Sequence, residues 1–264
     1  MIYIHLIGHN FEYEVRELTK EFFFNEEIEF VDSIDEYHEG ILIISRLSNN
    51  GKKLMSKVEI YEDKQLVYYD DINIDTIDIG RDDIYKKIKV GITTNLYNGL
   101  NIISPVKAPW GILTGVRPLK IVHDLLDKNY SLDSIYQILT EGYMLFPEKA
   151  NLLLSIANKQ RKYIYPLDEK RFSLYIAIPF CPTRCIYCSF PACSIGKYGH
   201  MVDIYTDKLI YELDEIGKLM KDYNISTVYI GGGTPTAIPV KNLERIIKAV
   251  YNNFDKEKIK EFTV

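Results

Sequence analysis

All four cysteines of the chain lie between residues 181 and 193, and three of them have the spacing of a metal-cluster loop. Cys181, Cys185 and Cys188 are separated by three residues and then by two. Thiolates at such spacing on one compact loop can converge on an iron–sulfur cluster. A cubane cluster has four irons, so three cysteines leave one iron without a protein ligand. A metal with an open coordination position can bind a substrate or cofactor and take part in a reaction.

Two other uses of these cysteines stay open from the residues alone. A structural zinc ion needs four ligands, and Cys193 would be the fourth, although zinc sites usually pair two short Cys-x-x-Cys units across a longer gap. A disulfide framework is the weaker alternative, because it normally spreads its cysteines through a small secreted chain. We therefore favour a cluster.

The elements around the loop predict a parallel sheet. Residues 174–179 form an apolar strand before the first cysteine, 200–223 an amphipathic helix, 227–230 a second strand, 243–254 a second helix and 261–264 a third strand. Alternation of strand and helix predicts parallel strands joined by right-handed crossovers. Ligands in such folds lie at the carboxyl ends of the strands, where the cysteine loop begins.

Three glycines, Gly231, Gly232 and Gly233, end the second strand. Glycine lets backbone N–H groups approach a ligand closely, but a tight strand-to-helix turn explains the glycines equally well. A phosphate-binding Walker loop is excluded, because no Gly-Lys-Ser/Thr follows.

Before this catalytic segment, 171–264, we predict an N-terminal α+β domain over 1–104 and a helical connector over 105–170. In the first, short strands rich in Ile, Val and Tyr alternate with polar turns, and Asp82 is expected to cap a helix from Asp83 towards Leu100. The predicted strands and helices are 2–7, 28–31, 41–45, 58–61 and 66–69, and 11–24, 132–140 and 147–163, with Pro118 opening a further helix.

The charge and the apolar content of the sequence exclude some classes of function. The net charge is −5 and the pI about 5.6, which argues against a polyanion binder, so we expect no nucleic-acid partner. The N-terminus has no signal-peptide pattern and no apolar stretch approaches the ~18 residues of a membrane span. We expect a cytoplasmic protein.

The cysteine loop, with Tyr187 just before its third cysteine, resembles the signature of the radical S-adenosylmethionine (radical SAM) superfamily. Residues 173–181 resemble the first strand, and 229–236 the second-strand motif, of the oxygen-independent coproporphyrinogen III oxidase (dehydrogenase) family. Residues 110–120 look like its HemZ-type branch.

The resemblance implies a [4Fe-4S] cluster on Cys181, Cys185 and Cys188, and S-adenosylmethionine on its free iron. Tyr187 would lie against the adenine, and Tyr175 is the candidate catalytic residue. The methionine end would meet residues at the end of the second strand, namely Gly231, Gly232, Gly233 and Thr234.

The implied reaction starts from a 5′-deoxyadenosyl radical, which takes hydrogen from the propionates of coproporphyrinogen III. Loss of carbon dioxide leaves vinyl groups and yields protoporphyrinogen IX. An external electron donor and acceptor are also implied. Ala177 stands where better-known members have His, and Phe190 where many have a further Cys, so a heme-binding or heme-delivery role, or another substrate, remains an alternative.

The implied fold is α/β, with the N-terminal α+β domain and helical connector leading into a partial (β/α)₆ barrel. Only two β/α units and the start of a third strand are present in the sequence. At roughly 30 residues per unit, we expect the barrel to be truncated.

Overall fold

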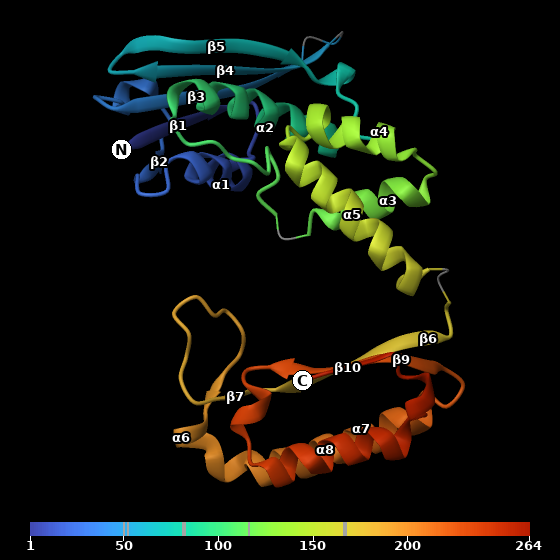
Figure 1. The fold of residues 1–264 in the computed structure, drawn as a ribbon. Coiled ribbons are helices and arrows are strands. Elements are labelled where there is room, and N and C mark those ends of the chain that lie inside the picture. The colour runs from blue at the N-terminus through green and yellow to red at the C-terminus, as the bar shows by residue number, and fades with distance from the viewer. Residues whose placement is uncertain (50, 52, 81–82, 116, 166–167) are drawn as a thin grey trace. The chain divides into compact units, whose positions relative to one another are not determined.

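The computed structural model describes residues 1–264 except 50, 52, 81–82, 116 and 166–167 (Figure 1). The chain divides into two compact units, Met1–Ile164 and Tyr165–Val264. In the part of the chain that is described, no helix has both the length and the apolar character needed to cross a membrane.

A five-stranded mixed sheet organises the first unit, with the order β2-β1-β3-β4-β5. The central strand β1 is parallel to β2 and β3, and β3, β4 and β5 follow one another as antiparallel neighbours. The five predicted strands are confirmed, several of them with longer bounds: β1 (Ile2–Ile7), β2 (Ile28–Phe30), β3 (Ile41–Asn49), β4 (Leu54–Glu62) and β5 (Gln65–Asn73).

Two helices, α1 (Glu12–Phe22) and α2 (Ile84–Ile103), pack with this sheet. Their buried residues share one core cluster with those of β1, β3 and β4, which explains the alternation of buried and partly buried positions along β1 and β4. The predicted cap Asp82 lies outside the described residues, and the observed N-cap of α2 is Asp83, whose side chain accepts a hydrogen bond from the Lys86 amide.

Helices after residue 104 join the same core. They are α3 (Leu119–Asp127), α4 (Leu132–Gln137) with a π-helical extension η3 (Ile138–Gly142), and α5 (Pro147–Ile164). The core cluster that begins at Ile2 continues to Ala157. A boundary at residue 104 therefore stays a prediction. Single 3₁₀ turns in this unit are η1 (Ile34–Glu36) and η2 (Ile74–Thr76).

The second unit contains the predicted parallel sheet, in the order β10-β9-β6. Its strands are β6 (Arg171–Ile178), β9 (Asn224–Gly232) and β10 (Glu261–Thr263), and the two crossover helices are α7 (Val202–Leu219) and α8 (Val240–Asn253). Leu174, Ile176 and Ile178 of β6 share a core with these helices, so one face of the sheet is buried (Figure 1).

The sheet is open, and the partial barrel stays a prediction. The predicted helix 200–223 is too long at both ends, because residues 199–201 form a separate 3₁₀ turn and the helix ends at Leu219. The remaining short elements are β7 (Phe180–Cys181), β8 (Cys193–Ser194), α6 (Ile195–Tyr198), η4 (Gly199–Met201), η5 (Pro235–Ala237) and η6 (Lys256–Lys258).

The buried Asn95 yields a stability prediction for the first unit. Its amide donates to the carbonyls of Ser56 (2.9 Å) and Asp70 (3.3 Å), and so ties α2 to β4 and β5. Asn95→Ala leaves both carbonyls without this donor and should cost about 1–3 kcal/mol of unfolding free energy. Urea unfolding followed by the fluorescence of Trp110, the single tryptophan, measures it. The matched change Asn98→Ala, at a partly exposed position of the same helix, should cost less than about 0.5 kcal/mol; equal costs for the two variants would contradict the assignment.

Candidate functional site

The cysteine loop is held at its two ends. Strands β7 and β8 pair in parallel, with Phe180 opposite Cys193, and the Cys193 amide donates to the Pro179 carbonyl at 2.7 Å. The predicted ligand Cys181 thus lies at one fixed end of the loop, directly after β6. The other two predicted ligands lie in the irregular stretch between β7 and β8.

Within the loop, Cys185 and Cys188 lie on one tight turn, closed by a 3.1 Å hydrogen bond from the Cys188 amide to the Cys185 carbonyl. Cys185 is exposed and Cys188 is partly buried, and all four cysteines are free thiols. Among the residues that the structure describes, no three His, Cys, Asp or Glu side chains are gathered closely enough to hold a metal ion. The three thiols share a loop without forming a closed ligand set.

The glycines at the end of β9 lie against the backbone that leads into the loop. Gly232 has φ +99°, and a Cβ there would lie 2.9 Å from both the amide nitrogen and the carbonyl oxygen of Ile178. The Gly233 amide donates to the Ile178 carbonyl (2.7 Å), and the Thr234 amide to the Phe180 carbonyl (2.9 Å). The glycines thus allow two chain segments to meet at backbone distance.

This close approach brings the glycine segment to the first cysteine. A Cβ on Gly233 would lie 2.7 Å from the Cys181 sulfur. The Thr234 hydroxyl lies 3.6 Å from the same sulfur, within hydrogen-bonding distance of it. The structure therefore joins three of the predicted site residues, Cys181, Gly233 and Thr234, in one contact.

The two tyrosines on the uncovered face of the second sheet stack on each other. Tyr175 of β6 lies opposite Tyr229 of β9, with the ring centroids 5.6 Å apart and the planes 12° from parallel. Both rings remain about half exposed, at 58% and 48%. Gly231 adjoins them, since a Cβ there would lie 3.1 Å from the Tyr175 hydroxyl. Tyr175 thus reaches the glycine segment from the neighbouring strand.

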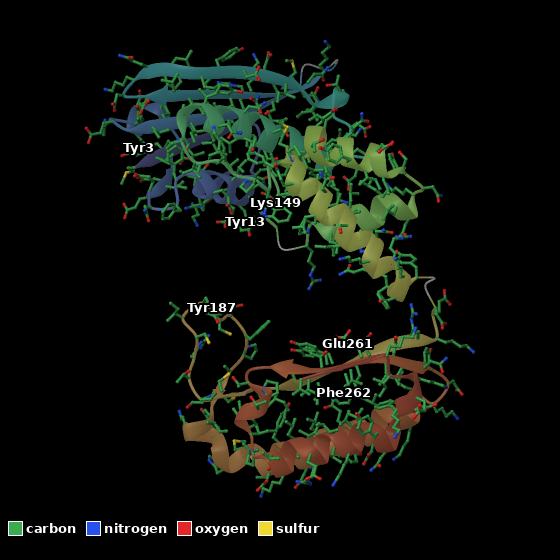
Figure 2. The ribbon with its side chains drawn as sticks, viewed as in Figure 1. Tyr3, Tyr13, Lys149, Tyr187, Glu261 and Phe262 are labelled. Atoms are coloured by element: carbon green, nitrogen blue, oxygen red, sulfur yellow. The ribbon has the colours of Figure 1, made fainter. Side chains whose placement is uncertain are left out.

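Tyr187 lies in the exposed part of the loop, with 87% of its surface accessible (Figure 2). Its hydrogen bond with Cys185 raises the pKa of the phenol above its ordinary value. Ile186 beside it is fully exposed and Phe190 largely so. The middle of the loop therefore presents apolar and aromatic side chains that nothing in the second unit buries.

Sequence reasoning missed the residue that fixes the end of β6. The hydroxyl of Tyr205, on α7, donates to the Ala177 carbonyl at 2.5 Å, and its ring packs edge-on against Phe180. Burial raises the pKa of Tyr205, with the charge of Glu212 adding to it. Tyr205 lies on the apolar face of its helix and packs against the core of the second unit. The sequence signal for its role is a hydroxyl on a face that is otherwise apolar.

The side chains at this site are of the type that binds an iron–sulfur cluster. Three thiols lie on one loop, one of them is fixed beside a hydroxyl donor, and no disulfide consumes them. The loop ends are anchored while its middle is exposed, so cluster ligation itself would have to draw Cys185 and Cys188 together with Cys181.

The cysteine loop lies within a segment that matches a known protein family. Residues 175–264 match the radical SAM superfamily. The chain is 33% identical over 192 residues to an oxygen-independent coproporphyrinogen-III oxidase-like protein HemZ of Bacillus subtilis, over 71% of this chain and 38% of that protein. It is 40% identical over 98 residues to a heme chaperone HemW of Lactococcus lactis, over 36% of this chain and 24% of that protein. No solved structure gives a significant match.

The C-terminal segment, residues 175–264, therefore belongs to the radical SAM superfamily. Within it, the chain is related to the HemZ-like proteins, the oxygen-independent coproporphyrinogen III oxidases and the heme chaperones HemW. It spans 38% of the length of the HemZ-like relative and 24% of the Lactococcus HemW.

The contact at Gly233 yields a prediction. Gly233→Ala places a methyl group 2.7 Å from the Cys181 sulfur and 2.9 Å from the Phe180 carbonyl oxygen, so the β6–β7 segment must shift. We expect a loss of about 1–3 kcal/mol in the apo protein, from calorimetric unfolding, with the Trp110 urea curve unchanged.

Gly196→Ala is the control, because its methyl group would meet nothing closer than 3.7 Å. If the two variants unfolded alike, the close approach at Gly233 would not constrain this unit.

Proposed function

We propose that Cys181, Cys185 and Cys188 hold a [4Fe-4S] cluster and that the segment Gly231–Thr234 binds S-adenosylmethionine. The observation that carries this proposal is the contact between Cys181, Gly233 and Thr234, because it puts the glycine backbone beside the first cysteine. A ligand on a cluster at Cys181 would therefore meet the N–H groups and hydroxyl at the end of β9. Tyr187 would cover the adenine from the loop.

The bound cluster and S-adenosylmethionine would supply a carbon-centred radical that abstracts hydrogen from a substrate. The chain's own residues would position these groups and shield them from solvent. Tyr205 and the β7–β8 pair fix the start of the loop, and Gly232 and Gly233 bring β9 to it. Tyr175 directs its hydroxyl beside Gly231, at the edge of the cofactor segment, and is our candidate catalytic residue.

For the reaction we propose oxygen-independent decarboxylation of the propionates of coproporphyrinogen III to vinyl groups, giving protoporphyrinogen IX with an external electron donor and acceptor. The HemZ-like relative supports this, since it covers 71% of the chain. A heme-binding or heme-delivery role is the second candidate. It is supported by the 40% identity over 98 residues to a HemW heme chaperone.

The cluster assignment predicts metal content. After anaerobic reconstitution, the protein should hold about four irons and as many sulfides, and Cys185→Ala should lose most of both. Cys193→Ala is the matched control and should keep them, because Cys193 lies outside the three-cysteine spacing. Stoichiometric zinc without sulfide, lost as completely in Cys193→Ala as in Cys185→Ala, would instead indicate the four-cysteine zinc alternative.

The substrate assignment predicts turnover. The protein should release carbon dioxide from coproporphyrinogen III while it consumes S-adenosylmethionine, and Tyr175→Phe should slow this at least about tenfold. Tyr211→Phe, at an exposed position on α7, should leave the rate unchanged.

The outcomes separate the candidates. Tight heme binding, without substrate-dependent consumption of S-adenosylmethionine, would replace the oxidase assignment with the heme-delivery role. Full turnover in Tyr175→Phe would remove Tyr175 from the chemistry.

A further inference from the structure

The second face of the five-stranded sheet in the first unit carries a pocket. On this face lie Leu42, Ile44 and Tyr37, which form a small hydrophobic cluster separate from the main core. The pocket has a volume of about 490 Å³ and lies over β3 and β4, beside the turn η1. Ligand pockets in proteins commonly span about 300–1,000 Å³ and combine an apolar lining with a few polar groups.

The floor of the pocket is one face of the β-sheet and is largely apolar, apart from the carboxylate of Glu59. Leu42 and Ile44 are almost fully buried, and they pair across the strands with Tyr61 and Glu59. Because directly opposite residues of antiparallel strands share one face, these side chains form a continuous floor. A flat apolar molecule would match it.

Hydrogen bonds hold the wall of the pocket in place. The Tyr37 hydroxyl donates to the Gly40 carbonyl (2.8 Å) and accepts from the Lys64 amide (3.1 Å), so it ties the segment after η1 to the β4–β5 turn. Ser33 and Glu36 close a capping box around η1. The pocket is therefore preformed, which lowers the entropy lost when a ligand binds.

The charges of the pocket are unequally satisfied. The carboxylate of Glu59 accepts from the Tyr61 hydroxyl (3.0 Å), and that of Asp35 from the Ser33 hydroxyl (3.2 Å). Both cations, Arg46 and Lys64, are exposed, and within the described part of the chain neither side chain has a hydrogen bond or an ion pair. An anionic group on a ligand could form an ion pair with either of these side chains.

The two cations lie at opposite ends of the floor. Lys64 is in the β4–β5 turn next to the Leu42–Tyr61 pair, whereas Arg46 lies four residues further along β3, about 13 Å away at the usual strand rise. Arg46 also carries the planar fork that suits a carboxylate. The Arg46 end of the floor therefore suits a carboxylate better than the Lys64 end does.

We propose that this pocket binds a flat apolar molecule that carries a carboxylate, with its apolar body on Leu42, Ile44 and Tyr61 and its carboxylate on Arg46. The site is separate from the cluster loop and does not depend on the function proposed for it. Its lining residues all belong to the first unit.

Fluorescence titration with 1-pyrenebutyrate, an aromatic carboxylate, tests the proposal. Saturable binding is expected, and it should weaken at least about fivefold in Arg46→Gln, a change at an exposed position that leaves the floor intact. 1-Pyrenebutanol has the same body without the charge. It should bind more weakly, and Arg46→Gln should not affect it.

Lys57→Gln is the matched variant. Lys57 is the cross-strand partner of Arg46 on the same face, but it does not line the pocket, so its loss should weaken pyrenebutyrate binding less than twofold. If the two variants weakened binding equally, the carboxylate would be attracted by general surface charge rather than by Arg46, and the proposal would be overturned. Absence of saturable pyrenebutyrate binding would also overturn it.

Discussion

The second unit depends on one close contact between two backbones. Where β9 ends, Gly232 and Gly233 lie against the chain from Ile178 to Phe180 with no side chain between them. A Cβ at either glycine would come within 3.0 Å of an Ile178 backbone atom, so larger residues would separate the segments. This contact places the hydroxyl of Thr234 beside the sulfur of Cys181. The glycines thus have a structural role as well as the proposed binding role.

The rest of the loop is held far less firmly than this contact. Its ends belong to the β7–β8 pair, but Ile186, Tyr187 and Phe190 in its middle are largely exposed. Segments with few buried contacts are the first to unfold locally. Metal binding can offset the free-energy cost of ordering such a segment. A cluster would therefore act here as a structural link as well as a cofactor, drawing Cys185 and Cys188 towards the fixed Cys181.

The sequence predicted most of this arrangement from periodicity. Strands β6 and β9 and helices α7 and α8 were expected from their apolar patterns, because both elements bury one face on a common core. The ends of the elements were predicted less accurately. The helix expected over 200–223 is shorter, since the turn at residues 199–201 continues the apolar pattern without continuing the helix. The β7–β8 pair has two residues in each strand, too few for any pattern to show.

Contacts between segments that are distant in the sequence could not be predicted from it. The glycines predicted a tight turn or a ligand, but only the register of β9 on β6 shows that Gly233 meets Cys181. Helical spacing places Tyr205 on the core face of α7, but it does not show that the hydroxyl donates to the Ala177 carbonyl. The pocket at Arg46 depends on which face of the first sheet the helices leave open. Periodicity separates the two faces of a strand but does not assign a helix to either.

The central claim is that the three-cysteine loop and the end of β9 form one site for a cluster and S-adenosylmethionine. The most direct test is the EPR spectrum of the reduced, reconstituted protein, recorded with and without S-adenosylmethionine. We expect a [4Fe-4S] signal that changes when S-adenosylmethionine is added, because the open iron gains a ligand. A signal that S-adenosylmethionine leaves unchanged, or stoichiometric zinc without sulfide, would contradict it.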